Sequence, residues 1–361
     1  MDQSSENDGE GSKSSGKQKK DGKHVNGGEK ENHEWNGKKR TSRVDGPRQA
    51  KENHPRKAAE INSVQVDKGK ITQLSTSGLI NLGNTCYINA VLQGLWRMIT
   101  QIELLQRYST WLAGVKVTEL ENEFWSLMCR MSSQTKGPVS PHKFRSAVTK
   151  VNRDFRSGRQ QDAHEFLMLV LGRVRRLEQN CVGSWTSNVV CASCKSLSSH
   201  QVESFSCLSV GIPYVHPAES QSSPVTITDC FKHTFKEEVV KDQQDPWSCG
   251  NCGADSAVKS TRMEAWPHVL LLHLKRFKPI LGQYQKNQSV VEVGNTFEVE
   301  GEQYRVLAKV NHVGATMESG HYTADIRLEK WKRCDDRRIF DSQPQDRSQE
   351  VYLIFSERVN R

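Results

Sequence analysis

Two Cys-x-x-Cys pairs constrain the fold of this chain more than any other feature of its sequence. They are Cys191 and Cys194, and then, after 54 intervening residues, Cys249 and Cys252. Two such pairs supply the four tetrahedral thiolates that a structural zinc ion prefers. Four thiolates leave no open coordination position, so we expect a structural Zn²⁺ that clamps together two hairpins distant in sequence. The alternative is a cluster that has kept its cysteines without holding a metal.

The order of hydrophobic patterns along the chain indicates an α+β fold. Residues 77 to about 183 show helical spacing, with apolar stripes that begin at Ile88, Leu120 and Ala163. From about Ser184 onward the pattern is typical of strands, including Val269–Phe277, Tyr304–Val310, Tyr322–Arg327 and Val351–Phe355. Helices first and strands afterwards favour two packed layers, with the chemistry at the seam between them.

Residues 1 to 76 differ in composition from the rest of the chain. They are rich in Gly, Ser, Lys, Glu and Asn, carry 16 Lys and Arg against 12 Asp and Glu, and contain Trp35 as their only large aromatic residue. Such a segment buries too little apolar surface to offset the entropy lost on ordering. We therefore expect a disordered basic polar tail at 1–76 ahead of a folded domain at 77–361. Short basic clusters at Lys17–Lys20 and Lys38–Arg40 are compatible with nuclear import or acidic partners.

Composition narrows the setting. The first residues, Met1 to Lys13, contain no apolar stretch, so we expect no secretory signal. The sequence has no run of 18 consecutive apolar residues, so we expect no membrane-spanning helix. In such a chain ten cysteines indicate metal ligands and catalysis rather than disulfides, so we expect a reducing compartment, nuclear and/or cytoplasmic. The net charge of +9 is modest, and basic residues do not alternate with aromatic ones, so nucleic acid is not an expected partner.

Cys86 is the first candidate for chemistry. It follows Asn84 and Thr85, two good helix N-cap residues, and precedes a regular apolar stripe, so the spacing predicts a helix that begins beside it. The partial positive charge of a helix N-terminus favours the thiolate, which is the nucleophilic form of cysteine. The alternative is a half-buried structural cysteine.

His321 and Asp335 supply the rest of a possible catalytic group. A papain-like mechanism needs a histidine to hold the thiolate as an ion pair, and an acid or amide to fix the tautomer of that histidine. Two adjacent strands can present His321 and Asp335 side by side despite their separation in sequence. His312 is a rival base, and Asp336 is a rival acid that a turn after Asp335 would admit.

The residues around these positions resemble one family. Residues 78–87, Gly-Leu-Ile-Asn-Leu-Gly-Asn-Thr-Cys-Tyr, resemble the cysteine box of the ubiquitin-specific proteases. Gly320–Ala324, with Trp331 and Asp335-Asp336 downstream, resembles their histidine box, and Gln160–Leu167 and His273–Phe277 are similar to two blocks between the boxes. The segments occur in the order of the family, with the two cysteine pairs between them, so the resemblance covers about residues 77–357.

The resemblance implies a papain-like cysteine protease shaped as a right hand. The helical half forms the thumb, a zinc-tipped ribbon at about 184–262 forms the fingers, and the later strands form the palm. The implied substrates are ubiquitin and ubiquitinated proteins, with the ubiquitin tail between thumb and palm. The implied activity is thiol-dependent hydrolysis of the bond after the C-terminal glycine of ubiquitin. An inactive ubiquitin-binding scaffold and a protease for another ubiquitin-like modifier remain alternatives.

The resemblance also assigns roles to single residues. Cys86 matches the nucleophile, His321 the general base and acid, Asp335 the orienting residue, and Asn81 the amide that donates to the oxyanion. Gln160, Asp162 and Glu165 match positions that hold the basic tail of ubiquitin, while Gly320 leaves room for its Gly-Gly end. Asp162 and Glu165 lie three residues apart, so a helix brings both to one face as an anionic site for an arginine; the alternative is a solvated N-terminal turn. His164, between them, is expected to be exposed.

Overall fold

The structure, a computed structural model, describes residues 75–105, 117–133, 137–156, 158–215, 224–240, 247–280, 283–316 and 319–359. All of these residues belong to one compact unit. The predicted tail lies outside the described residues apart from 75 and 76, so its disorder stays a prediction. Among the helices of the described residues, none is long and apolar enough to cross a membrane.

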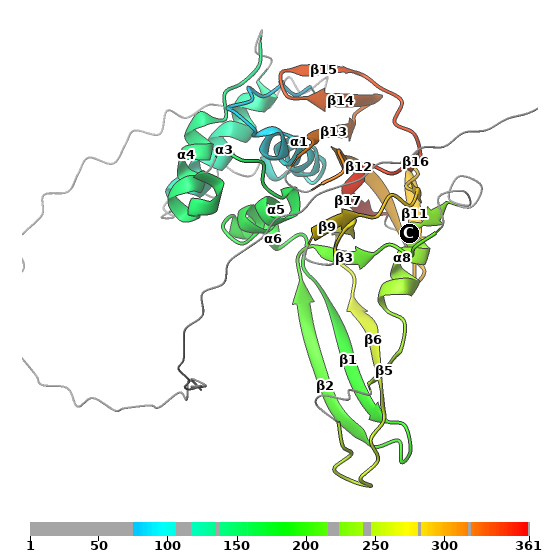
Figure 1. Cartoon of the computed structure of the whole chain (residues 1–361). Helices are drawn as coiled ribbons and strands as arrows, with labels where there is room; N and C mark the ends of the chain where they lie inside the picture. The colour runs from blue at the N-terminus through cyan, green and yellow to red at the C-terminus, as the bar shows by residue number, and fades with distance from the viewer. Residues whose placement is uncertain are drawn as a thin grey trace, which may run out of the picture. The chain divides into compact units, whose positions relative to one another are not determined.

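The predicted helical stripes form the thumb (Figure 1). Leu120 and its stripe lie on α3, whose N-cap Thr118 accepts a hydrogen bond from the Glu121 N–H. The stripe that begins at Ala163 lies on a helix that ends at Leu171, before Gly172. The thumb helices are α1 (Cys86–Gln101), α3 (Glu119–Ser132), α4 (His142–Val151), a 3-10 turn (Arg153–Arg156), α5 (Ala163–Leu171) and α6 (Arg175–Glu178).

Helix α1 is the central helix of the domain and is buried on every side. The predicted apolar stripe is fully inside, with Leu92 and Leu95 at 0% exposure. The opposite stripe is polar, and it is buried too: Asn89, Gln93 and Arg97 recur every four residues. Each donates a hydrogen bond to another segment, namely the Asp336 carboxylate, the Ser77 carbonyl and the Arg327 carbonyl. The helix is therefore held in the core by hydrogen bonds from its polar stripe as well as by the packing of its apolar stripe.

The palm is a sheet with the strand order β15-β14-β13-β12-β17-β7-β3, and β11 pairs with β12. Every pairing in it is antiparallel except that of β3 with β7. Helix α1 packs closely on one face: a Cβ at Gly94 would lie 2.6 Å from the Phe355 ring of β17. The strands are β3 (Leu208–Gly211), β7 (Val269–Lys275), β11 (Thr296–Val299), β12 (Glu302–Val313), β13 (His321–Arg327), β14 (Trp331–Asp335), β15 (Arg338–Asp341) and β17 (Val351–Arg358).

The other face of the palm carries a second apolar cluster. Helix α8 (Ile227–Thr234) contributes Ile227 and Phe231 to it, and the palm contributes Leu272 and Val306. Short strands complete this side: β4 (Val225–Thr226), β10 (Val291–Glu292) and β16 (Arg347–Ser348) form one sheet, and β8 (Phe277–Ile280) pairs with β9 (Gln283–Lys286).

The fingers are a separate antiparallel sheet with the order β2-β1-β6-β5 (Figure 1). Its strands are β1 (Gly183–Cys191), β2 (Leu197–Phe205), β5 (Glu238–Val240) and β6 (Ala257–Ala265). The predicted span of 184–262 is therefore interrupted, because β3 and α8 fall within it and belong to the palm side. The chain forms two strands of the fingers, returns to the palm and then forms the other two. The sequence pattern alone does not show this return.

Candidate active site

Cys86 is the first residue of α1 and its side chain is buried, with 2% of the residue exposed. The helix begins where the sequence predicts, but Thr85 does not cap it with its side chain. The Thr85 hydroxyl instead accepts a hydrogen bond from the Leu82 N–H at 2.8 Å. The side-chain oxygen Oδ1 of Asn81 accepts from the N–H groups of Gly83 and Thr85, so side chains hold the loop before the thiol.

Burial decides the protonation of this thiol. It raises the pKa of Cys86, and the negative charge of Asp336 raises it further, while the N–H groups of Tyr322, Tyr87 and Cys86 itself act in the opposite direction. The helix N-terminus alone therefore does not produce the thiolate that the sequence suggested. A thiol in this setting needs a base to remove its proton.

The candidate base and its acid lie on adjacent strands, as expected. His321 is the first residue of β13, Asp335 is the last residue of β14, and the two strands run antiparallel. The His321 ring nitrogen Nε2 lies 2.7 Å from Asp335 Oδ1. This contact leaves Nδ1 without a hydrogen-bond partner among the described residues. The Tyr322 N–H next to this histidine points at the Cys86 sulfur, so the thiol lies beside the start of β13.

Asp336 has a different environment from Asp335. Its backbone φ of +48° places it in the turn after β14, and its carbonyl accepts a hydrogen bond from the Leu79 N–H at 2.7 Å. The Asp336 carboxylate accepts two amide hydrogen bonds, from Asn81 Nδ2 at 2.8 Å and from Asn89 Nδ2 at 2.7 Å. The second acid thus bonds to the loop that precedes Cys86 and to α1, and not to the imidazole.

Gln160 lies between the thiol and the segment that leads into His321. Its Nε2 donates to the Gly320 carbonyl and lies 3.8 Å from the Cys86 sulfur, while its buried Oε1 has no partner in the part of the chain that the structure describes. Gly320 has a φ of +155°, and a Cβ there would lie 2.5 Å from His312 Nε2. His312 therefore lies so close that only glycine fits at position 320. This is a second reason for the glycine, beside the room that the substrate tail would need.

His312 itself is a buried packing residue rather than a free base. It is fully buried between the rings of Phe277 and Tyr322. Burial and the neighbouring Lys286 and Arg276 lower its pKa to about 4. The Lys286 ammonium lies 3.2 Å from His312 Nδ1 and also donates to the carbonyls of residues 312 and 314.

The two candidate acidic residues of α5 do not share one environment. Asp162 is buried and is the N-cap of the helix: its Oδ1 accepts from the N–H groups of His164 and Glu165, and its Oδ2 accepts from the Tyr352 hydroxyl. Glu165 is exposed, and partial burial together with the charge of Asp162 raises its pKa. The expected pair is thus one capping carboxylate and one carboxylate open to solvent.

His164 does not have the exposed position that the sequence suggested. Its ring is half-buried and stacks on His273 of β7, with the ring centroids 4.0 Å apart. Burial lowers the pKa of both histidines, that of His273 to about 2. The expectation was wrong because the helical position alone does not reveal that a palm strand lies against this face of α5.

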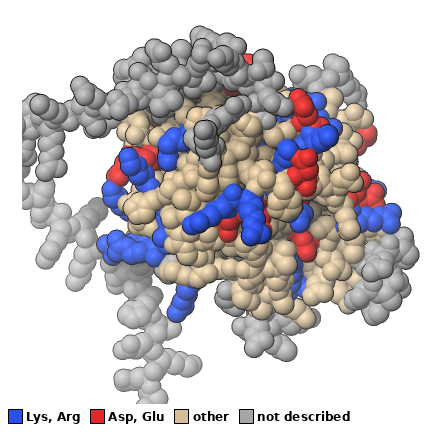
Figure 2. All heavy atoms as spheres, turned by 90° about the horizontal axis from the view of Figure 1, so that it is seen from above, with Lys and Arg blue, Asp and Glu red and all other residues tan. Residues whose placement is uncertain are grey.

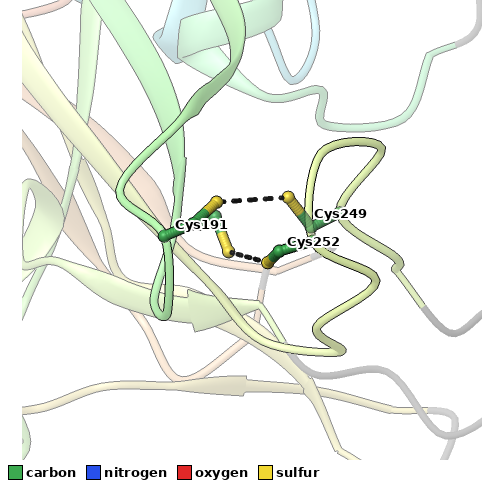
Figure 3. Close-up of side chains that lie close together, drawn as sticks. Cys191, Cys249 and Cys252 are labelled. Atoms are coloured by element: carbon green, nitrogen blue, oxygen red, sulfur yellow. Dashed lines mark hydrogen bonds between the residues drawn. The ribbon is translucent and has the colours of Figure 1, made fainter.

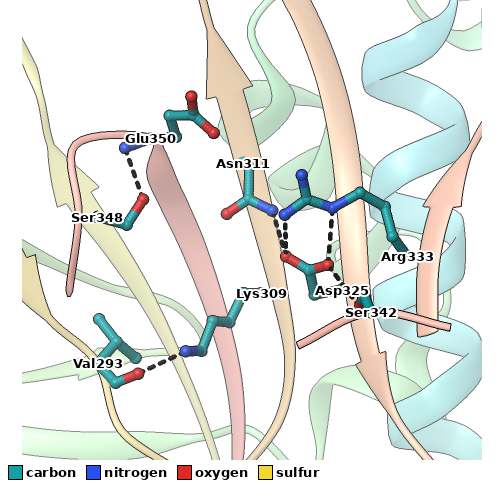
Figure 4. A network of polar contacts seen from close by, with 8 residues as sticks. All are labelled: Val293, Lys309, Asn311, Asp325, Arg333, Ser342, Ser348 and Glu350. Carbon is teal, nitrogen blue, oxygen red and sulfur yellow. Dashed lines mark hydrogen bonds and ion pairs between the residues drawn. The ribbon is translucent and has the colours of Figure 1, made fainter. Parts of the chain in front are cut away.

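A polar network on the palm fixes the strands that carry His321 and Asp335 (Figure 4). Asp325, 1% exposed, accepts two hydrogen bonds of 2.9 Å from the Arg333 guanidinium and one of 2.7 Å from Asn311 Nδ2. Asp325 lies opposite Arg333 in the register of β13 and β14. Buried Lys309 of β12 donates to the Val293 carbonyl at the edge of the same network. A bidentate pair of this kind fixes the relative position of its two strands.

The face of the molecule seen from above in Figure 1 carries charges of both signs (Figure 2). Blue and red side chains are interspersed on it, without a large field of one sign among the residues drawn in colour. The ion pair of Lys332 with Asp341 links β14 to β15.

The four cysteines of the two pairs meet at the tip of the fingers (Figure 3). Their sulfur atoms lie within 4.8 Å of one another, with 3.7 Å between Cys191 and Cys252 and 3.7 Å between Cys194 and Cys249. Four sulfurs at about 2.3 Å from a tetrahedral zinc are about 3.8 Å apart. The four thiol donors and these two sulfur–sulfur distances therefore fit Zn²⁺.

Comparison with known proteins identifies the family. Residues 77–355 match the family model described as ubiquitin carboxyl-terminal hydrolase, which is more than half of the 361 residues. The chain belongs to this family. The match confirms the resemblance to ubiquitin-specific proteases that the cysteine and histidine boxes carry.

Individual ubiquitin carboxyl-terminal hydrolases are similar at moderate identity. Ubiquitin carboxyl-terminal hydrolase 22 of Homo sapiens is 27% identical over 356 residues, covering 77% of this chain and 65% of that protein. Ubiquitin carboxyl-terminal hydrolase 4 of Arabidopsis thaliana is 29% identical, covering 73% of this chain and 84% of that protein. The chain spans less than two thirds of the first of these relatives.

A solved structure shows the same fold. The SAGA Ubp8/Sgf11/Sus1/Sgf73 DUB module bound to ubiquitin aldehyde matches with a TM-score of 0.66 at 21% sequence identity. The match covers 79% of this chain and 70% of that chain. It confirms the predicted α+β architecture of thumb, palm and fingers.

Three residues of the site in this family member escaped the sequence reasoning. Asn89 holds Asp336, Tyr352 donates to Asp162, and Arg333 pairs with Asp325. Asn89 lies on α1 three residues after Cys86, and its position on the polar stripe of that helix was the one available signal. Tyr352 and Arg333 lie on strands whose partners only the sheet register determines.

Proposed function

We propose that this chain is a thiol-dependent deubiquitinase that hydrolyses the isopeptide or peptide bond after the C-terminal glycine of ubiquitin. One observation carries the proposal: a histidine bonded to an acid through Nε2, with Nδ1 free, stands at the start of a strand whose next N–H points at a buried thiol. That arrangement supports a thiol protease, and the family supplies the substrate.

The chemistry follows from these residues. His321 Nδ1 removes the proton of Cys86, and the thiolate adds to the carbonyl carbon of the last glycine. The electrons of the C=O bond move to oxygen, where the Cys86 N–H and the second N–H of Asn81 Nδ2 stabilise the negative charge. The intermediate collapses to a thioester as the imidazolium protonates the departing amine. Water, deprotonated by His321, then releases ubiquitin and restores the thiol. Asp335 holds the imidazole tautomer throughout.

Residues of the thumb and the loop before β13 support the approach of the substrate tail. Glu165 is exposed and available to a basic residue of the tail, while Asp162 adds negative charge behind it and fixes the start of α5. Gln160 and Gly320 border the thiol, and we propose that the extended Gly-Gly end passes over them. The bond of Gln160 to the Gly320 carbonyl would have to open for this passage.

Zinc has a structural part in the proposal. Cys191, Cys194, Cys249 and Cys252 would hold one Zn²⁺ at the tip of the fingers. A bound zinc supplies folding energy to the sheet that carries it, and a closed set of four thiolates leaves no position for catalysis. Thiolate zinc and a free catalytic thiol both require a reducing setting, so we propose a nuclear and/or cytoplasmic location.

The experiment is hydrolysis of a fluorogenic conjugate at the C-terminus of ubiquitin, with matched conjugates of related modifiers and Cys86→Ala as the control. We expect turnover of the ubiquitin conjugate by the full chain and none by Cys86→Ala, which should still bind ubiquitin. Binding without turnover by the wild-type chain would indicate a scaffold. Preferred cleavage of another conjugate would assign the chain to a different modifier.

A further inference from the structure

Asn89 is a buried amide next to the thiol that no step of the proposed reaction uses. It lies on α1, one turn after Cys86, and is 2% exposed. Its Nδ2 donates to Asp336 Oδ1 at 2.7 Å, and its buried Oδ1 has no hydrogen-bond partner within the described ranges. A buried polar atom left unbonded is costly, so the bond that this residue does make needs an explanation.

The bond continues to the oxyanion side of the site. Asp336 Oδ2 accepts from Asn81 Nδ2 at 2.8 Å, so one carboxylate is gripped by two amides. The Asn81 oxygen accepts from the N–H groups of Gly83 and Thr85 and from the Thr85 hydroxyl, which fixes the orientation of the amide. Asp336 is the one partner of Asn81 Nδ2 among the described residues, so its second N–H remains available for the substrate.

We propose that Asn89 is a positioning residue for hydrolysis: it holds the Asp336 carboxylate at the angle that aims the free N–H of Asn81 at the developing oxyanion. The inference rests on the proposed function. The order of contacts is Asn89, Asp336, Asn81 and then substrate, so Asn89 acts without touching the reacting atoms.

The second reason for such a grip is the neighbouring imidazole. Ligand atoms of His321, Asp335 and Asp336 all lie within 4.8 Å of one another. A carboxylate at this distance from a histidine that becomes an imidazolium during the reaction is attracted to it. The Asn89 amide, which lies on the buried helix α1, keeps the Asp336 carboxylate hydrogen-bonded to Asn81. Asp335 alone then serves His321.

The test compares Asn89→Leu with Gln93→Leu. Both changes replace a buried amide of α1, but Gln93 donates to the Ser77 carbonyl at 2.9 Å and takes no part in the site. For Asn89→Leu we expect kcat on the fluorogenic ubiquitin conjugate to fall at least about tenfold with KM within about twofold, as for loss of one transition-state donor. Gln93→Leu should keep kcat. Asn89→Ala, which leaves room for water, guards against misfolding of the leucine variant.

Three further readouts separate positioning from general damage. Alkylation of Cys86 by iodoacetamide should persist in Asn89→Leu, since thiol ionisation does not need the oxyanion donor and depends on Asp336 only through its charge. Asn81→Ala combined with Asn89→Leu should be no slower than Asn81→Ala alone, because both act as one unit. The Asn81 side-chain amide signal in a ¹⁵N spectrum, assigned by its loss in Asn81→Ala, should shift in Asn89→Leu and not in Gln93→Leu.

The outcomes distinguish the two proposals. An active wild-type chain whose Asn89 variants keep kcat, or whose double variant is additive, overturns the role of Asn89. An inactive wild-type chain refutes the proposed function, and the Asn81 signal then decides this inference alone. An unshifted signal in Asn89→Leu refutes the positioning in either case.

Discussion

Acid should destabilise this protein through His312, and the structure gives the size of the effect. The ring is fully buried, with the Lys286 ammonium 3.2 Å from Nδ1 and Arg276 nearby, and its pKa is lowered to about 4. In the unfolded chain a histidine titrates at about 6.5. Between these two values the unfolded state binds a proton that the folded state does not. The free energy of unfolding therefore falls as the pH is lowered from about 6.5 towards 4.

The magnitude follows from the distance to the unfolded pKa. Each unit is worth about 1.4 kcal/mol, so at pH 5 the stability lost through His312 is about 2 kcal/mol. That is a large fraction of a typical domain stability of about 5–15 kcal/mol. Burial disfavours the charged imidazolium, and its protonation would also place it in contact with the Lys286 cation, which is why the folded state takes up the proton only near pH 4.

The assay is urea unfolding followed by tryptophan fluorescence at about pH 7 and about pH 5, with His312→Asn as the variant. The amide oxygen of this variant lies where Nδ1 lies and can still accept from Lys286, but it does not titrate in this range. We expect the loss of stability between the two pH values to be smaller by about 2 kcal/mol in His312→Asn. Other groups titrate equally in both proteins and cancel. An equal loss in wild type and variant would refute the reasoning.

Three more outcomes follow from the site. Asp335→Ala should abolish most turnover, whereas Asp336→Ala should lower kcat less, because only Asp335 is hydrogen-bonded to His321; the reverse ranking on the same ubiquitin conjugate would contradict this. Tyr352→Phe should lower the free energy of unfolding by about 2 kcal/mol, since a buried bond to the Asp162 carboxylate is lost, and urea unfolding measures it. Elemental analysis should find one zinc per chain, and Cys249→Ser should lose the metal and weaken ubiquitin binding while Cys86 alkylation persists; a metal-free wild-type protein would refute the zinc site.

The sequence predicted the elements that local patterns determine. The start of α1 at Cys86, the strands that carry His321 and Asp335, and the closeness of the four cysteines were all expected. These features depend on the helical apolar period, on alternation and on ligand spacing, which neighbouring residues display. They can therefore be predicted without knowing which elements pack against them.

The features that the sequence did not predict depend on partners distant in the chain. Nothing near Asn89 shows that its amide meets a carboxylate 247 residues away. His164 was expected in solvent, and only the position of β7 places His273 against it. The fingers were expected as one run because hydrophobic alternation does not distinguish a strand of the fingers from one of the palm. Sheet register depends on the packing of the whole domain, so local sequence does not predict these contacts and only the structure shows them.

Two adjacent acids can serve two different groups because the strand ends between them. On a continued strand Asp335 and Asp336 would point to opposite faces, and only one could reach the site. With β14 ending at Asp335 and Asp336 at a φ of +48°, the first carboxylate stays in line with β13 while the second turns back over the N-terminus of α1. The Leu79 N–H holds that turn through the Asp336 carbonyl, and Asn89 holds its carboxylate. The proximity of Asp336 also raises the pKa of Cys86, so the carboxylate that aims the oxyanion donor opposes ionisation of the nucleophile. Because Asp336 raises the pKa of Cys86, the thiol needs a base, and His321 held by Asp335 is placed to be that base. The carboxylate that orients Asn81 therefore makes the His321–Asp335 pair necessary.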